Sequence, residues 1–188
     1  LEMLREAASS GIRAAVATPH VLNDLSLSWE QRVLSHFRET ARAVIEEKLE
    51  IDIYLGSEIF FQLGLNDLIE RPIGSYRGMG IHSLLEVSLS QYSRYFPEAT
   101  ENLISRGKRP IFAHPERVIP LIGDFQTISS LVSSGVIIQI SAGSVLGDFG
   151  KRISEFSWGL MEQKLVHCIA SDSHNSTKRP FNLDSAWL

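Results

Sequence analysis

The chain has 188 residues, of which 44% are hydrophobic and 21% are charged, and its formal net charge at pH 7 is −4. This is the composition of a globular domain with its own core, and it excludes extended disorder. The net negative charge gives no reason to expect nucleic-acid binding, and no apolar run is long enough to span a membrane. We therefore expect a protein that is not inserted in a membrane. Because the only cysteine, Cys168, has no partner for an internal disulfide, we expect a cytoplasmic location.

Helical and strand-like segments alternate along the chain. In order, the pattern predicts a helix at 1–10, a strand at 12–17, a loop at 21–28, a helix at 29–48 capped by Ser28, strands at 51–55 and 84–88, a helix at 96–106, a strand at 109–113, a helix at 124–134, a strand at 136–141, a loop at 143–150, a helix at 151–163 and a strand at 165–170. This alternation favours an α/β fold with a parallel sheet. With no linker or repeat, residues 1–188 are predicted to form one domain.

The chain begins with a helix, although a β/α barrel should begin with a strand. Leu1, Met3 and Leu4 fall roughly on one face of that helix. We therefore expect a first strand to precede Leu1, which makes the chain an N-terminally truncated domain. Residues 182–188 look like a helix that has just begun.

Residues that bind hard or borderline metal ions stand at or near the ends of five apolar runs. They are His20, Glu58, Glu86, His114, Asp172 and His174. In a parallel barrel the strand ends deliver such side chains to one rim. Imidazole and carboxylate without thiolate suit Mn, Fe, Co, Zn or Mg, and a shared carboxylate can bridge two ions about 3.5–4 Å apart. The sequence thus predicts a multinuclear metal site.

Less specific interpretations remain for single residues. A lone histidine after a strand is more often structural than a ligand, and His36, His82 and His167 are interpreted in that way. Glu58 could instead be an acidic residue in the first turn of a helix. A carboxylate within the apolar run around Glu86 is costly to bury unpaired, so a metal ion or an arginine is expected near it.

Two arginines follow candidate ligands closely. Arg117 stands three residues beyond His114, and Arg179 follows the last ligand pair. The guanidinium fork donates two hydrogen bonds at once, which suits the oxygens of a phosphate group. The alternative for both is a salt bridge with a neighbouring carboxylate.

Thiol-based phosphatase chemistry is excluded by the surroundings of Cys168. That chemistry requires an arginine separated from the cysteine by five residues, and His174 stands at this position. Cys168 also lies in an apolar strand rather than in a phosphate-binding loop.

Taken together, these segments resemble the PHP (polymerase and histidinol phosphatase) superfamily. More narrowly, the chain is similar to the bacterial metal-dependent protein-tyrosine phosphatases encoded with capsular and exopolysaccharide synthesis genes. The resemblance covers nearly the whole chain and is carried by Ala17-Thr18-Pro19-His20, Gly56-Ser57-Glu58, Leu84-Leu85-Glu86, Ala113-His114-Pro115-Glu116-Arg117, Ile140–Ser144 with Gly147, Ser171-Asp172-Ser173-His174 and Asn175–Pro180.

The resemblance implies a distorted (β/α)7 TIM-like barrel of the PHP type, with two or three divalent ions that are usually Mn²⁺. His20, Glu58, Glu86, His114, Asp172 and His174 match its metal positions, and Arg117 and Arg179 match its phosphate positions. It also implies direct hydrolysis of phosphotyrosine by a metal-activated hydroxide. The expected partner is a bacterial tyrosine autokinase that controls polysaccharide chain length. The His-x-His motif and following Asp of the family are absent here and are expected before Leu1.

Three alternatives remain open. A PHP enzyme acting on a small phosphomonoester such as histidinol phosphate would share the metal cluster but differ in its pocket. An amidohydrolase-like metal hydrolase is disfavoured by Arg117. The chain could also be a catalytically inactive barrel that acts as a binding module, since the N-terminal ligands are absent from it.

Overall fold

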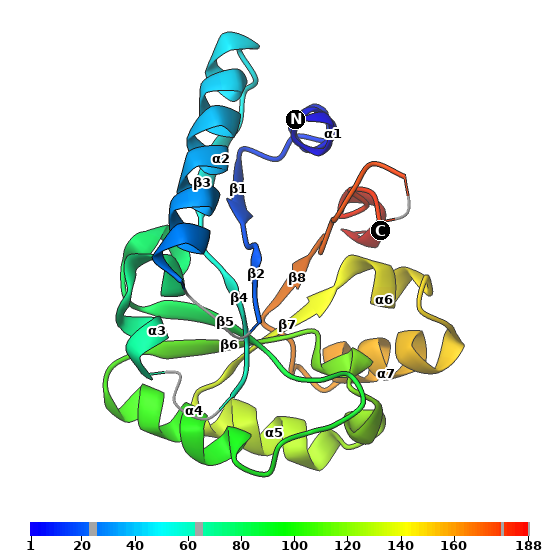
Figure 1. Ribbon diagram of the computed structural model, residues 1–188. Coiled ribbons are helices and arrows are strands. Elements are labelled where there is room, and N and C mark those ends of the chain that lie inside the picture. The colour runs from blue at the N-terminus through cyan, green and yellow to red at the C-terminus, as the bar shows by residue number, and fades with distance from the viewer. Residues whose placement is uncertain (23–25, 63–65, 178, 188) are drawn as a thin grey trace.

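Parallel strands flanked by helices form the structure, a computed structural model that describes residues 1–22, 26–62, 66–177 and 179–187 (Figure 1). The helices are α1 (Glu2–Ser9), α2 (Leu27–Glu46), α3 (Asn66–Glu70), α4 (Phe96–Ser105), α5 (Phe125–Ser134), α6 (Ala142–Leu146) and α7 (Lys151–Glu162). The strands are β1 (Ala14–Ala17), β2 (His20–Val21), β3 (Asp52–Leu55), β4 (Glu58–Phe60), β5 (His82–Glu86), β6 (Arg109–Ala113), β7 (Ile137–Ser141) and β8 (Cys168–Ala170). The 3₁₀ turns within the described ranges include η3 (Pro115–Arg117) and η5 (Asp184–Trp187).

All described strand pairs are parallel, which confirms the predicted α/β class. Strands β1 and β3 form a two-stranded sheet, and the other strands form a six-stranded sheet in the order β2-β4-β5-β6-β7-β8. The carboxyl ends of parallel strands share one edge of a sheet, so residues far apart in the chain can meet there.

Two predicted strand ends are bends at which the chain continues into a second short strand. Thr18 and Pro19 separate β1 from β2, and Gly56 and Ser57 separate β3 from β4. At both places the polypeptide therefore passes from the smaller sheet into the larger one. A Cβ at Gly56 would lie 2.7 Å from the Tyr76 ring, so only glycine fits at this bend. His20 and Glu58 therefore begin strands, whereas the sequence suggested that they follow strands.

The hydrophobic core lies between the central strands and the helices that cover them. Leu85, Phe112 and Ile138 of three neighbouring strands are fully buried, and the Phe96 ring of α4 lies 4.5 Å from the Phe112 ring between centroids. Burying each such side chain stabilises the fold by about 1.5–3 kcal/mol. Apolar residues on both faces are expected of a parallel sheet covered by helices, and this core holds the strand ends in place.

Several predicted boundaries were wrong by a few residues. The long helix begins at Leu27 and is capped by Ser26, whose hydroxyl accepts a hydrogen bond from the Trp29 amide, rather than by Ser28. The predicted loop at 143–150 overlaps the helix α6, and the helix expected to begin in the final segment is the 3₁₀ turn η5. Residues 23–25 of the predicted loop at 21–28 lie outside the described residues.

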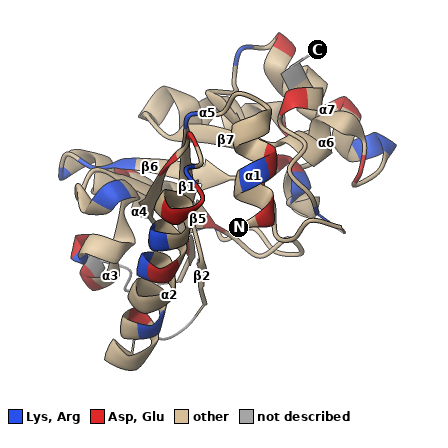
Figure 2. Ribbon diagram, turned by 90° about the horizontal axis from the view of Figure 1, so that it is seen from above, with Lys and Arg blue, Asp and Glu red and all other residues tan. Residues whose placement is uncertain are grey.

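The two terminal segments lie on the same side of the structure (Figure 1), where Phe181 packs against the small apolar cluster of α1, α2 and β3. Arg5 of α1 donates two hydrogen bonds to the Glu47 carboxylate just after α2, and charges of both signs are spread along α2 (Figure 2). Within the described ranges, none of the helices combines the length and the apolar character that crossing a bilayer requires.

Candidate metal centre

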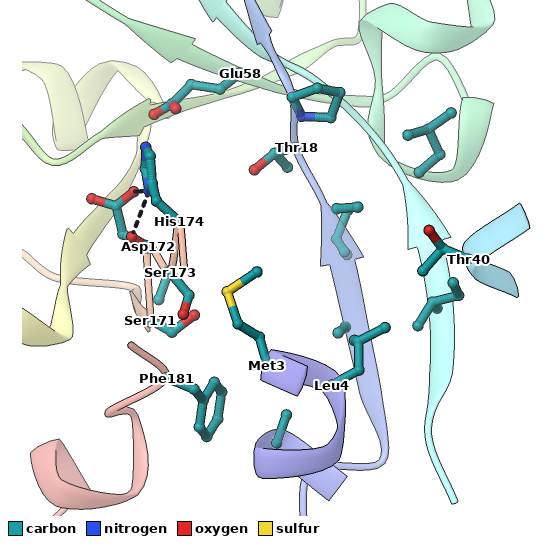
Figure 3. Close-up of a pocket in the computed structure, with 18 of the residues that line it drawn as sticks. Met3, Leu4, Thr18, Thr40, Glu58, Ser171, Asp172, Ser173, His174 and Phe181 are labelled. Atoms are coloured by element: carbon teal, nitrogen blue, oxygen red, sulfur yellow. Dashed lines mark hydrogen bonds and ion pairs between the residues drawn. The ribbon is translucent and has the colours of Figure 1, made fainter. Parts of the chain in front are cut away.

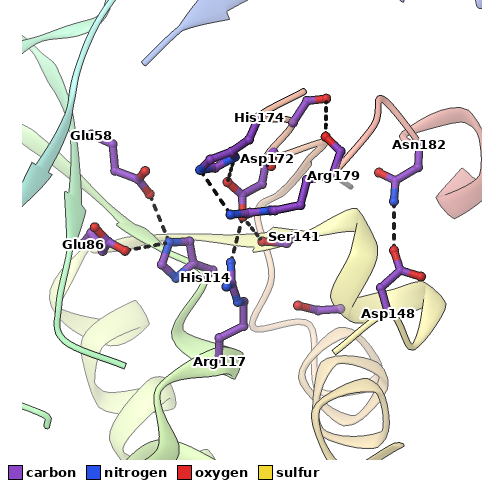
Figure 4. Close-up of polar contacts among 12 residues, drawn as sticks. Glu58, Glu86, His114, Arg117, Ser141, Asp148, Asp172, His174, Arg179 and Asn182 are labelled. Atoms are coloured by element: carbon purple, nitrogen blue, oxygen red, sulfur yellow. Dashed lines mark hydrogen bonds and ion pairs between the residues drawn. The ribbon is translucent and has the colours of Figure 1, made fainter. Parts of the chain in front are cut away.

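Six candidate ligand residues and two arginines lie together on one side of the large sheet. Figure 4 shows these residues apart from His20. His20, Glu58 and Glu86 come from β2, β4 and β5, His114 follows β6, and Asp172 and His174 follow β8. The residues after β6 and β8 meet because parallel strands end at one edge, whereas His20 and Glu58 begin their strands and lie side by side through the pairing of β2 with β4. The structure thus brings together all six side chains that the sequence singled out as metal ligands.

His20, Glu58 and Glu86 form the tightest group. One ligand atom from each lies within 4.8 Å of the others, a spacing that could hold a metal ion. His20 Nδ1 lies 3.2 Å from Glu58 Oε2 and 3.5 Å from Glu86 Oε2, while its Nε2 lies 3.3 Å from His174 Nε2. The His20 ring therefore faces both carboxylates with one nitrogen and the His174 imidazole with the other.

His114 extends this group towards the interior. Its Nε2 lies 3.0 Å from Glu58 Oε1 and 3.5 Å from Glu86 Oε1, and its side chain is only 5% exposed. Its Nδ1 is buried and has no hydrogen-bond partner among the described residues. Each glutamate thus offers one oxygen to His20 and the other to His114, as a carboxylate that bridges two ions would.

The pKa values of three residues in this group are shifted by their contacts with one another. The hydrogen bond to Glu86 raises the pKa of His20, against partial burial, and the charge of Glu58 raises it further. Burial lowers the pKa of His114, but the hydrogen bond and charge of Glu58 outweigh burial and leave this pKa raised. Burial raises the pKa of Glu86, yet its hydrogen bond with His20 and the charge of His114 leave it lowered. A divalent cation fits such a set, because it satisfies carboxylates that are otherwise costly to bury.

Asp172 joins this cluster to the arginines. Its Oδ2 accepts hydrogen bonds from Arg117 Nη1 at 2.9 Å, from Ser141 Oγ at 3.0 Å and from Arg179 Nη2. Its Oδ1 lies 3.8 Å from His174 Nδ1. One carboxylate thus has an oxygen beside the imidazole cluster and an oxygen held by two guanidinium groups. The salt bridge that the sequence left as the alternative for both arginines is present, and it places them together.

Two residues of the site have left-handed backbone conformations. The φ angle is +35° at His114 and +50° at Asp172, and neither residue is glycine. Such a conformation costs of order 1 kcal/mol or more in a non-glycine residue and is maintained only by the surrounding structure. Both residues lie close after the end of a strand, His114 after β6 and Asp172 after β8.

Glu116 is a supporting residue that sequence reasoning missed, because it was noted only as part of the His-Pro-Glu-Arg segment. It is completely buried, and burial raises its pKa. Its Oε1 accepts hydrogen bonds from the Ser141 amide at 3.0 Å and from the Ser144 hydroxyl at 2.6 Å. The side chain therefore joins the turn that carries His114 and Arg117 to the end of β7.

Replacing Glu116 with alanine is expected to lower the free energy of unfolding by about 3–5 kcal/mol, because it leaves a cavity and two buried donors without an acceptor. Glu116→Gln keeps a carbonyl oxygen for both serine donors and should cost less than about 2 kcal/mol. Urea unfolding measures both, with the exposed Glu155→Ala as a control expected to change stability by less than about 0.5 kcal/mol. Equal losses for the alanine and glutamine variants would contradict this role.

A pocket of about 770 Å³ opens beside the cluster (Figure 3). Glu58, Asp172 and His174 lie at one end of it, while Met3 of α1 and Phe181 line the rest. Four of the six candidate ligands, His20, Glu58, Asp172 and His174, therefore line a pocket that opens beside the sheet. In contrast, His167 Nδ1 accepts a hydrogen bond from the Ile138 amide, which supports the structural interpretation of that histidine.

Comparison with known proteins identifies the family of this chain. The family described as "Capsular polysaccharide synthesis, CpsB/CapC" matches residues 1–187. The chain belongs to the CpsB/CapC family. The CapC protein of Staphylococcus aureus is 32% identical over 187 residues, which cover 97% of this chain and 72% of that protein. The tyrosine-protein phosphatase YwqE of Bacillus subtilis is also 32% identical over 187 residues, covering 99% of this chain and 73% of YwqE.

Solved structures of the CpsB/CapC family share this fold. A crystal structure from work on YwqE of Bacillus subtilis and CpsB of Streptococcus pneumoniae, described as "unique metal-dependent tyrosine phosphatases", matches with a TM-score of 0.85. The sequence identity is 30%, and the match covers 98% of this chain and 75% of that chain. The resemblance drawn from the sequence is thereby confirmed at the level of the family.

Proposed function

We propose that this chain is a metal-dependent protein-tyrosine phosphatase that acts in capsular polysaccharide synthesis. The observation that carries this proposal is the position of Asp172, whose carboxylate lies between an imidazole–carboxylate cluster and two guanidinium groups. A phosphate monoester needs both features, cations for its oxygens and donors for its developing charge. The relatives named as tyrosine-protein phosphatases support the same activity.

The metal ligands we propose lie together beside the large sheet and carry imidazole or carboxylate donors, namely His20, Glu58, Glu86, His114, Asp172 and His174. This donor set, which has no thiolate, fits Mn²⁺, and the bridging arrangement of Glu58 and Glu86 supports two or more ions. Bound divalent ions would supply Lewis-acid polarisation of the phosphoryl oxygens and lower the pKa of a water molecule.

The protein side chains do the binding and orienting. Arg117 and Arg179, which both reach Asp172, would donate to phosphoryl oxygens and counter the charge that develops there during hydrolysis. The ordinary pKa of a tyrosine hydroxyl is about 10, so a phenolate leaves more readily than an alkoxide. The site therefore needs no strong general acid beside the leaving group.

We further propose that residues 1–188 form one domain in which the sheet curves as part of a distorted (β/α)7 barrel of the PHP type. Strands β2 and β8 are the two edges of the six-stranded sheet, yet His20 on β2 lies 3.3 Å from His174 just after β8. A flat sheet would keep its edges far apart. This close approach supports a barrel-like curvature.

The proposed substrate is a phosphotyrosine on a protein, with a tyrosine autokinase of polysaccharide synthesis as the partner. A small phosphomonoester such as histidinol phosphate is the second candidate, because the pocket beside the ligands is large enough for either. Comparing kcat/KM for a phosphotyrosyl peptide with kcat/KM for histidinol phosphate separates them. A cytoplasmic location stays a prediction from the sequence.

Chelation tests the metal dependence of the proposed activity. Treatment of the protein with EDTA is expected to reduce phosphotyrosyl-peptide hydrolysis by at least about 100-fold, since Lewis-acid stabilisation contributes several kcal/mol to the transition state. Activity should return on adding back divalent ions, most fully with Mn²⁺. Full turnover by protein whose metal content is below one-tenth of an ion per chain by mass spectrometry would refute the proposal.

A further inference from the structure

One aromatic ring lies against both arginines of the site. The centroid of the Phe149 ring is 4.2 Å from Cζ of Arg117 and 5.8 Å from Cζ of Arg179. The three residues come from separate parts of the chain: the loop between α6 and α7, the turn η3, and the segment after β8. Both guanidinium groups also donate to the same oxygen of Asp172. The ring and the carboxylate therefore contact the arginines in two different ways.

The loop that carries Phe149 is held by its own contacts. The Asp148 amide donates to the Gly143 carbonyl at 2.8 Å, and Asp148 Oδ2 accepts from Asn182 Nδ2 at 3.2 Å (Figure 4). A Cβ at Gly143 would lie 3.1 Å from Cε2 of the Phe149 ring, so the absence of a side chain there lets the ring pack closely on α6. The ring thus occupies a defined position relative to the site.

Two positive groups that converge on one carboxylate oxygen repel each other, so their common position needs support. The face of an aromatic ring carries negative potential and attracts a guanidinium group, by about 0.5–1 kcal/mol when exposed and about 2 kcal/mol when desolvated. A guanidinium group that stacks through its face keeps its N–H edge free for hydrogen bonds. Contact with Phe149 therefore leaves both arginines able to bind an anion.

We propose that Phe149 is a positioning residue that holds the guanidinium groups of Arg117 and Arg179 together for binding the phosphoryl group of the substrate. This inference rests on the proposed phosphatase function and names a residue outside the candidate ligands and arginines. It differs from simple packing, because it assigns the effect to the electrostatics of the ring face rather than to its volume.

Three replacements of Phe149 separate electrostatics from packing. Phe149→Leu keeps an apolar side chain of similar bulk but removes the ring, Phe149→Tyr keeps the ring, and pentafluorophenylalanine at this position keeps the shape while removing the negative potential of the face. The readouts are the dissociation constant for inorganic phosphate, by calorimetry on the metal-loaded protein, and kcat and KM for a phosphotyrosyl peptide. Thermal unfolding of each variant reports its stability.

Phosphate affinity is expected to fall about tenfold in Phe149→Leu and in the pentafluorophenylalanine protein, and to stay within about threefold of wild type in Phe149→Tyr. The value of kcat/KM should follow the same order. The matched control is Tyr54→Leu, which removes the ring under Arg77 at 4.3 Å in another part of the structure and should leave both readouts unchanged.

Wild-type phosphate affinity in the pentafluorophenylalanine protein would overturn the inference, and so would a tyrosine variant as impaired as the leucine variant. The fluorinated ring keeps its packing, so this comparison decides the matter even if Phe149→Leu does not fold. Wild-type protein that hydrolyses no phosphotyrosyl peptide would contradict the proposed function alone, because phosphate titration still measures the effect of the ring on the arginines.

Discussion

Replacing His114 with alanine is expected to lower kcat for a phosphotyrosyl peptide by about a thousandfold or more while the protein remains folded. The imidazole is buried between Glu58 and Glu86, 3.0 Å and 3.5 Å from their nearest carboxylate oxygens. Without the imidazole, the two carboxylates would remain but the metal site would have lost one ligand. Steady-state kinetics and metal content by mass spectrometry measure the effect, and circular dichroism checks the fold.

His82→Ala is the matched control for this experiment. His82 lies on β5, as Glu86 does, but at the opposite end of the strand. Its loss should leave kcat within about twofold of wild type, in keeping with the small effects of changes away from a site. Near-normal turnover and metal content in the His114 variant would refute the assignment of His114 as a ligand.

Replacing Arg117 with alanine is expected to lower kcat/KM for phosphate esters by about 10²–10³-fold without reducing metal content. Its side chain is 14% exposed and donates to Asp172, beside the cluster rather than within it. Removing one positioned donor therefore weakens stabilisation of the phosphoryl charge, while Ser141 and Arg179 still hold the Asp172 carboxylate in place. Arg117→Lys should recover only part of the loss, because an ammonium group cannot reproduce the planar fork.

Arg77→Ala provides the comparison, since Arg77 also lies over an aromatic ring, that of Tyr54, but belongs to a different turn. It should retain the kinetics of the wild type. If the Arg117 variant instead lost its metal ions together with its activity, Arg117 would be supporting the cluster, and the proposed contact with phosphate would be wrong.

The sequence predicted the parallel sheet and the meeting of the candidate ligands for the same reason. Apolar runs such as Arg109–Ala113 coincide with observed strands, and parallel strands end at one edge. His20 and His174 could therefore be expected near each other from their places in the pattern. Local features were not predicted. The five-residue helix α6 begins with three small residues that fit a loop as well, and the bends at Thr18-Pro19 and Gly56-Ser57 depend on how the two sheets meet.

The supporting residues could not be found from the sequence, because their roles depend on contacts between distant elements. Glu116 is buried beneath Ser141 and Ser144, and Phe149 lies against two arginines that are far from it in the chain. A charged residue or an aromatic residue in a loop has no periodic pattern that distinguishes such roles. Only the tertiary structure shows which partners they have.

The approach of His20 to His174 has a thermodynamic consequence for the whole molecule. The two residues are separated by 154 positions in the chain, so in the unfolded polypeptide they meet only at the entropic cost of closing a very long loop. An ion that both imidazoles help to hold would bind the native state far more strongly than the denatured ensemble. Its binding free energy would then be added to the free energy of unfolding, so that occupancy of the centre and resistance to denaturation rise and fall together.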